Sequence, residues 1–208
     1  MRYIAALVLA VLVSGCVTDN FVDEPPQNIT IRQDYYEYSV PANFANFTPL
    51  LFELPVVKSP MPYYVYNDSE LNPYKYNVTL VNIKKAFDAW QNATNDKVIF
   101  NRTLEKPDLG ISIKLLSDIP NNTVGEASAL FYKRNNYTLI VGGEMQIETL
   151  YGGSENRVLL IHEIGHIMGF DHSDNSHSVM FPYNAYSQVI TDDILNTLDS
   201  IYKNVTVS

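Results

Sequence analysis

The stretch HEIGHIMGFDHS, residues 162–173, holds three of the four histidines of this 208-residue chain. His162 and His166 are four residues apart, so on a helix their rings project from one face, one turn apart. Gly169 would then end the helix, because glycine readily adopts the left-handed backbone that reverses the chain. The reversal would bring His172 back toward the same point. Three neutral imidazoles with a fourth position left for water are typical of a catalytic zinc site.

The rest of this segment is almost entirely apolar. Its apolar residues are Val158, Leu159, Leu160, Ile161, Ile164, Ile167 and Met168. The pattern predicts a buried helix from about Ser154, its N-cap, to Met168, with one polar face. Polar groups are costly to bury without partners, and a metal shared by the histidines would remove much of that cost.

Glu163 follows the first histidine and cannot share its direction on the helix. It can instead lie beside the metal-bound water and act as general base, taking a proton and passing it to the leaving amine. Zinc would lower the pKa of that water and polarise the scissile carbonyl. The full HExxHxxGxxH spacing is expected by chance only roughly a few times per million such chains. Two alternatives to a zinc-dependent enzyme remain. One is a surface binding or adhesion lipoprotein that has lost activity, and the other is a protein that keeps zinc only as a structural element.

The N-terminus is typical of a targeting segment. Arg2 precedes an apolar run, Tyr3–Val13, that is shorter than the roughly 20 residues needed to span a bilayer. The run ends in VSGC and resembles the lipobox of prokaryotic lipoproteins, so we expect a signal peptide over residues 1–15 and a lipid on Cys16. The alternative is an ordinary signal peptide with a coincidental cysteine. A lipid there would hold the protein at the extracellular face of the cell membrane.

Asn-x-Ser/Thr triplets are unusually frequent. Nine occur, where about 2.5 are expected from the frequencies of the three residue types. Together with the lipobox they suggest an exported, N-glycosylated chain and point to an archaeal cell surface. The candidate acceptors are Asn28, Asn46, Asn67, Asn92, Asn101, Asn121, Asn136 and Asn204. Asn77 is the doubtful ninth, because it could instead cap the helix that follows it.

Composition and charge set broader limits. A chain that is 46% hydrophobic can bury a sizeable core, and one folded domain is expected. A net charge of −9 argues against nucleic acid as a partner. Cys16 is the single cysteine, so no intramolecular disulfide can form. We expect a monomer, with an irregular, proline-interrupted arm over residues 16–58 and the folded domain over 59–208. The arm either packs on the domain or covers the active site as a pro-segment would.

The remaining pattern predicts an α/β (α+β) fold. Leu109–Leu115 alternates apolar and small or polar residues, which is typical of a half-buried strand. Expected strands are 62–66, 96–100 at an edge, 109–115, and a hairpin of 127–132 and 137–141; expected helices are 78–93 and 192–202, besides the histidine helix. Gly142 and Gly143 are expected in a loop. Asp192 and Asp193 most simply cap the last helix.

HEIGHIMGFDH followed by SVMFP at 178–182 resembles the metzincin zinc peptidases, the matrixin branch in particular. The resemblance extends to KKAFDAW, DLGISIKLL and TDDILNTLDSIY, from about residue 60 to the end. It implies a twisted, mostly parallel sheet with an N-terminal helix, an active-site helix, a Met-turn and a C-terminal helix. It also implies that His162, His166 and His172 bind one zinc, that Glu163 is the base, and that Met180 is the turn methionine. The second choice for Asp192 and Asp193, a buried contact to that turn, rests on the same resemblance.

The resemblance further implies a zinc-dependent endopeptidase that acts on peptides or proteins. A substrate would lie extended along the edge strand near Gly125–Leu130. The candidate substrate-binding residues are Gly125, Ala127, Ala129, Pro182 and Tyr183, where Tyr183 either lines the pocket or merely packs. The chain departs from matrixins in two respects. Its cysteine lies in the lipobox and so offers no cysteine switch, and His177 alone remains for a second zinc. Acidic residues are plentiful, so calcium binding is possible, but no loop has the sequence pattern of a calcium site.

Overall fold

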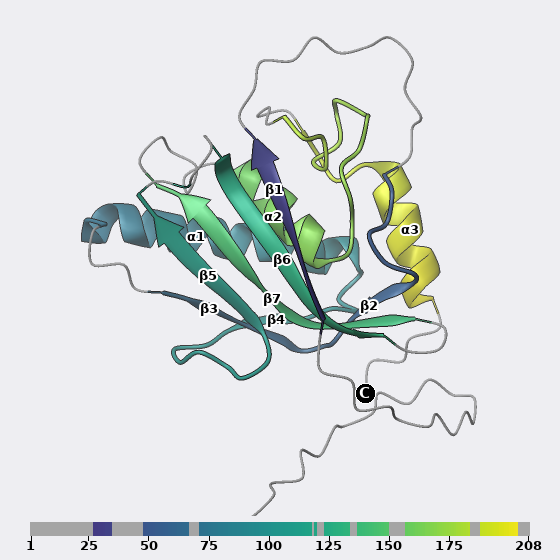
Figure 1. The fold of residues 1–208 in the computed structure, drawn as a ribbon, viewed down its shortest axis with the longest axis horizontal. Helices are drawn as coiled ribbons and strands as arrows, with labels where there is room; N and C mark the ends of the chain where they lie inside the picture. The colour runs from purple at the N-terminus through teal and green to yellow at the C-terminus, as the bar shows by residue number, and fades with distance from the viewer. Residues whose placement is uncertain are drawn as a thin grey trace, which may run out of the picture.

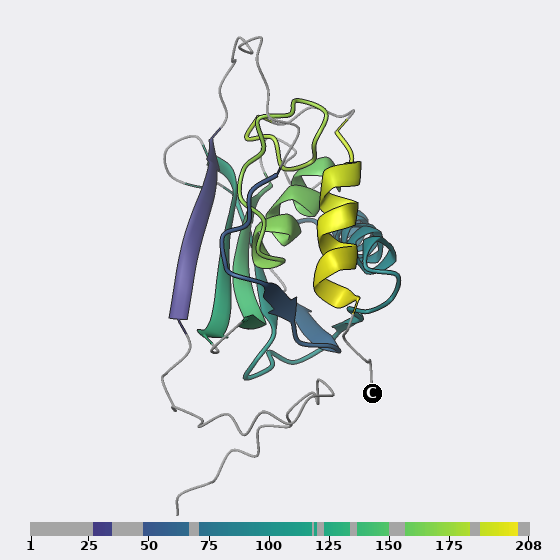
Figure 2. The same cartoon turned by 90° about the vertical axis from the view of Figure 1, so that its right-hand side faces the viewer.

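The computed structural model describes residues 27–34, 48–66, 71–117, 119, 123–133, 137–149, 157–183 and 188–203. In this part of the chain a seven-stranded sheet carries three helices, all on one of its faces (Figures 1 and 2). The mixed α/β class predicted from the sequence is confirmed. No helix in the described part is long and apolar enough to cross a membrane.

The sheet is mostly parallel. Its strands are β1 (Gln27–Asp34), β2 (Pro55–Val57), β3 (Met61–Val65), β4 (Phe100–Arg102), β5 (Ile111–Leu116), β6 (Thr123–Lys133) and β7 (Thr138–Glu148). They run in the order β1-β6-β7-β5-β3-β4, and β2 also pairs with β7. Strand β6 runs antiparallel to both of its neighbours, β1 on one side and β7 on the other. The alternating pattern of β5 buries Ile111, Ile113 and Leu115, as predicted.

Helix α1 (Pro73–Ala93) begins earlier than the predicted Val78. Asn72 is its N-cap, and its side-chain oxygen accepts a hydrogen bond from the Lys75 amide at 2.9 Å. Proline follows at the first helical position, where its missing N–H costs nothing. Asn77 therefore lies inside the helix, and the expectation that it caps the helix was wrong. Ile83, Phe87 and Trp90 form the apolar stripe of α1 and are buried.

The other two helices are α2 (Arg157–Ile167) and α3 (Asp192–Tyr202). Nearly every residue of α2 is buried, since the helix packs against α1, β6 and β7. Its expected cap, Ser154, is outside the described residues. The bounds predicted for α3 are confirmed. The expected capping by Asp192 and Asp193 is not found: Thr191 is the N-cap, and Asp193 accepts a hydrogen bond from the Thr48 amide at 2.7 Å.

Two local expectations about the sheet were wrong. Residues 96–99 lie outside any strand, because Asn95 and Asp96 turn the chain with φ of 51° and 59° before β4 begins. Gly142 and Gly143 lie within β7 and not in a loop. A Cβ at Gly142 would overlap the Gly110 backbone, and one at Gly143 would overlap the Ser128 carbonyl. These positions need glycine because a neighbouring backbone lies too close for a side chain. A sequence alone does not distinguish such a glycine from one in a turn.

The arm over residues 16–58 is more regular than expected, since it contains β1 and β2. Proline did not break these strands, because Pro55 is the first residue of β2, a position that needs no amide hydrogen. Residues 48–57, here called the strap, also join the domain. The Leu51 amide donates to the Gly169 carbonyl at 2.8 Å, and the Asp171 amide donates to the Pro49 carbonyl at 2.9 Å. Val57 is a core residue with 3% of its surface exposed.

Candidate metal centre

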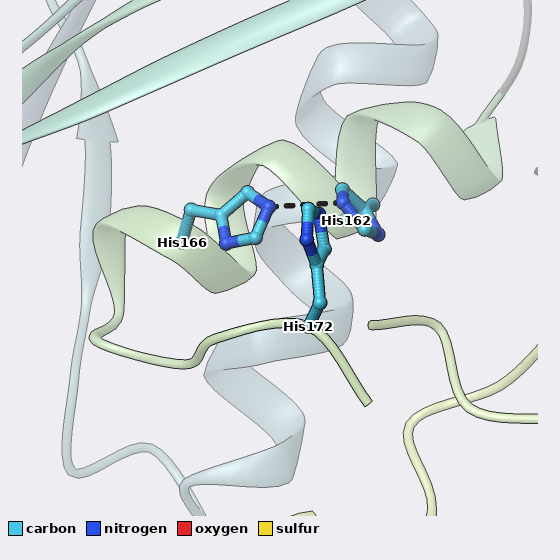
Figure 3. Close-up of side chains that lie close together, drawn as sticks. All are labelled: His162, His166 and His172. Carbon is cyan, nitrogen blue, oxygen red and sulfur yellow. Dashed lines mark hydrogen bonds between the residues drawn. The ribbon is translucent and has the colours of Figure 1, made fainter. Parts of the chain in front are cut away.

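Three imidazoles meet at one point in the structure (Figure 3). His162 and His166 project from α2, and His172 arrives from the segment after the helix. The chain reverses at Gly169, whose φ is +98°, and the Phe170 amide then donates to the Gly165 carbonyl at 3.0 Å. One nitrogen from each ring lies within 4.8 Å of the other two. The structure therefore confirms the expected convergence of the three rings, with Gly169 at the turn that returns His172.

Backbone carbonyls fix which nitrogen of His162 and which nitrogen of His166 faces the centre. Nδ1 of His162 lies 2.6 Å from the Val179 carbonyl oxygen, and Nδ1 of His166 lies 2.9 Å from that of Phe170. A carbonyl can only accept, so each Nδ1 carries the hydrogen and donates it. Each Nε2 then holds a lone pair, and the two Nε2 atoms are 2.9 Å apart. Two lone pairs at that distance require a cation or a proton between them.

A proton is a poor occupant of this place. Burial, followed by the neighbouring His166 and His172, lowers the pKa of His162 well below its ordinary value. Burial and then His172 lower the pKa of His166 to about 3. The rings of His162 and His166 therefore stay neutral, which is the form that coordinates metals, and imidazole suits zinc and other borderline transition metals. The residues present fit a metal ion held by three nitrogens.

Glu163 lies on the inner side of the same helix, against β6. A Cβ added at Gly125 would overlap its carboxylate, so the strand leaves room for this side chain only by having glycine there. Both carboxylate oxygens are buried and have no hydrogen-bond partner among the described residues. Burial, and then the charge of Glu126, raises the pKa of Glu163 well above its usual range. An unsatisfied buried carboxylate points to a partner that is not a protein group, such as water or a ligand.

This burial has a measurable consequence for the metal-free protein. Below about pH 4.5 the Glu163 carboxyl is protonated in both the folded and unfolded states, so its ionisation does not change the free energy of unfolding. Above that pH the unfolded state loses the proton while the folded state keeps it, which lowers the free energy of unfolding until the raised pKa is passed. Glutamine has no proton to lose. We expect Glu163→Gln and the parent to be equally stable at pH 4, and the variant to be more stable at pH 7.

The measurement is urea unfolding of both chains at the two pH values with chelator present. The difference should grow by about 1.4 kcal/mol at most for each pH unit in the window. A difference that shrinks with rising pH, or stays constant, would contradict the burial of an unpaired carboxylate.

Met180 and Trp90 pack against the back of α2. Met180 is buried, and a Cβ at Gly165 would overlap its sulfur, so the helix rests directly on this methionine. The Trp90 indole N–H donates to the Ile161 carbonyl at 2.8 Å and joins α1 to α2. The Ser173 amide donates to the Met180 carbonyl at 2.8 Å. This hydrogen bond joins the segment that carries His172 to the turn around Met180.

Comparison of the sequence with known families gives a match to Matrixin over residues 58–203. The chain belongs to the matrixin family. The match places it among the zinc metallopeptidases and includes every residue of the centre described above. No curated protein matches it.

Two solved structures are similar to this matrixin. Metalloproteinase-II from Bacteroides fragilis has 14% sequence identity and a TM-score of 0.45, with 86% of this chain and 59% of that one covered. High choriolytic enzyme 1, a hatching enzyme zinc-protease from the medaka Oryzias latipes, has 20% identity and a TM-score of 0.31, with 61% and 50% covered. The chain thus spans about three fifths of the length of the first and half of the length of the second.

The sequence left open whether the arm packs on the domain or covers the active site, and the strap, which is part of that arm, packs next to this centre. Leu50 forms an isolated antiparallel bridge with Phe170, between the glycine turn and His172. Pro55 packs closely on Gly169: a Cβ added to Gly169 would lie 2.6 Å from the Cβ of Pro55. The strap therefore braces the reversal that returns the third histidine. The apolar run of Leu50, Leu51 and Phe52, too apolar for a free linker, was the signal for it.

The predicted substrate-binding residues fall into two groups. Gly125, Ala127 and Ala129 lie on β6, but the side chains of both alanines are buried, which leaves their main chain as the part that can meet a peptide. Pro182 and Tyr183 follow Met180, and the Tyr183 ring lies 5.5 Å from that of Phe181, so this tyrosine packs on a neighbour. His177 is exposed and lies outside the histidine group.

Most predicted modification sites cannot be placed. Cys16 and the acceptors Asn46, Asn67, Asn121, Asn136 and Asn204 are outside the described residues. Asn92 and Asn101 are exposed, and Asn28 lies in β1.

Proposed function

We propose that this matrixin is a zinc-dependent endopeptidase in which His162, His166 and His172 hold the metal and Glu163 is the general base. The facing Nε2 atoms of His162 and His166 carry the proposal, because two carbonyl-fixed lone pairs 2.9 Å apart call for a shared cation. Zinc bound by these rings would supply Lewis acidity that polarises the scissile carbonyl.

Glu163 performs the proton transfers in this proposal. A water oxygen forms a bond to the peptide carbonyl carbon while its proton passes to the Glu163 carboxylate. The same proton then goes to the leaving amine as the C–N bond breaks. Burial keeps the proton on the Glu163 carboxyl in the metal-free protein, whereas a zinc ion held beside it would favour the carboxylate. Once ionised, this carboxylate would accept a proton more readily than an exposed one, because burial raises its proton affinity.

The substrate in this proposal is an extended polypeptide that lies along the outer edge of β6. That strand carries Gly125, which packs directly on the Glu163 carboxylate. A peptide on this edge gains main-chain hydrogen bonds whatever its sequence, and its carbonyls pass close to the base.

We also propose that the enzyme works outside the cell, held to the membrane by a lipid on Cys16. The VSGC sequence at 13–16 and the excess of Asn-x-Ser/Thr triplets support this proposal. Among the described acceptors, exposure of Asn92 and Asn101 agrees with glycosylation there.

Metal removal tests the proposed function. Dialysis against a chelator should abolish cleavage of a quenched peptide library, and one equivalent of zinc should restore it, while the circular dichroism spectrum at 25 °C stays unchanged. Calcium or magnesium added alone is the control and should restore nothing, because both prefer oxygen ligands. Cleavage that survives complete removal of zinc would exclude the mechanism.

A further inference from the structure

We propose that the chain's own residues 27–34 occupy the peptide-docking edge of this enzyme, so that β1 is a resident competitor of the substrate. The inference rests on the proposed function, which assigns the outer edge of β6 to an extended peptide. It concerns what lies on that edge before any substrate arrives.

The pairing of β1 with β6 runs in a single register from Gln27 to Gln33. Register partners run antiparallel from Gln27 opposite Phe131 to Arg32 opposite Glu126, and on to Asp34 opposite Thr123 (Figure 1). The other edge of β6 pairs with β7 over nearly the same length. Each strand edge has one row of N–H and C=O groups, and a row can pair with one neighbour at a time. With β1 in place, an incoming peptide therefore finds no open edge on β6.

The carboxyl end of β1 lies at the proposed catalytic carboxylate. Gln33 is the register partner of Gly125, the residue whose added Cβ would overlap Glu163. The register shifts at this point, between Gln33 and Asp34. The strand therefore covers the part of β6 where a scissile bond would have to lie, and not a distant part of the edge.

β1 differs from β2, the other strand of the arm. Val57 of β2 is in the core, and its amide donates to the Tyr202 hydroxyl at 3.0 Å. In the described part of the chain, β1 pairs with β6 alone, at the outer end of the sheet (Figure 2). Displacing β1 would thus expose a strand edge and leave the remaining order of strands intact.

Covalent connection makes this competitor effective. Residues 35–47 join β1 to Thr48, the first residue of the strap, whose amide is bound to Asp193. A segment joined to its site by a short stretch of the same chain competes at an effective concentration of the order of millimolar. A peptide substrate at micromolar concentration would therefore bind only after β1 is cut or pulled away.

The test replaces residues 27–34 by an eight-residue Gly/Ser segment in the otherwise complete chain, which keeps the length of the arm. The matched control replaces residues 17–24 in the same way. With a quenched peptide substrate, the 27–34 variant should show a kcat/KM at least about tenfold higher, through a lower KM with kcat unchanged, and the control should match the parent. A synthetic QNITIRQD peptide should inhibit the variant competitively, and a scrambled peptide should not.

Amide hydrogen exchange gives a readout that does not depend on cleavage. Exchange in residues 123–131 should be faster in the 27–34 variant than in the parent, and added QNITIRQD should restore protection. If kcat/KM does not rise, or the melting temperature falls with no gain in kcat/KM while the parent is active, β1 is a structural edge strand and the inference is wrong. If exchange responds as expected but neither chain cleaves any peptide, the proposed function fails and not the strand assignment.

Discussion

Glutamine in place of Glu163 is expected to lower kcat for peptide hydrolysis by about 10²- to 10⁴-fold, the range that a positioned acid–base group contributes. The variant keeps the shape of the side chain, so it still fits beside Gly125, but its amide cannot take up a proton from water. Zinc content should stay at that of the parent, because the three ring nitrogens do not include this residue.

Steady-state kinetics and metal analysis of the same preparation check this expectation. Glu105→Gln, which changes an exposed glutamate between β4 and β5, is the matched control and should behave as the parent does. A Glu163→Gln protein that cleaves at the parent's rate would remove this residue from the mechanism. Loss of zinc together with activity would instead make Glu163 part of the metal site.

Replacing His166 by alanine is expected to abolish tight zinc binding. The change removes one of three converging nitrogens, and leaves Nε2 of His162 without its partner at 2.9 Å. Loss of a residue that merely supports a ligand already costs about 10- to 100-fold in metal affinity, so loss of a ligand should cost at least about 100-fold. Activity should fall with the zinc.

Thermal unfolding with and without zinc measures this effect without reference to cleavage. An ion that binds only the folded state at 100 times its Kd stabilises that state by about 2.7 kcal/mol. The parent should therefore melt at a higher temperature when zinc is added, and His166→Ala should not. His177→Ala changes the exposed histidine outside the group and should respond as the parent does. Equal zinc stabilisation of all three proteins would refute the ligand set.

Local pattern was enough to predict the helices that carry or support the centre. The bounds predicted for α3 match the structure, and the histidine helix was placed to within a few residues. Spacing along a helix sets direction by itself, since residues four apart project from the same face. The start of α1 was missed because Asn72 and Pro73 precede the apolar stripe by which the helix was recognised.

Pairing between distant segments was not predictable in the same way. The sequence QNITIRQD of β1 lies about 90 residues before its partner strand, and main-chain pairing requires no particular side chain. The close backbone contacts of Gly142 and Gly143 were likewise hidden, because a glycine in a sheet and a glycine in a turn look the same in a sequence.

The sequence by itself determined the chemistry of the centre: three histidines at helical and turn spacing, a carboxylate beside the first of them, and the family to which that pattern belongs. Only the tertiary structure decided how these groups are used. The Val179 and Phe170 carbonyls choose which nitrogens face inward, and Gly125 leaves room for Glu163. The strap braces the return of His172, and β1 covers the edge of β6. Each of these contacts depends on backbone positions that the whole fold brings together.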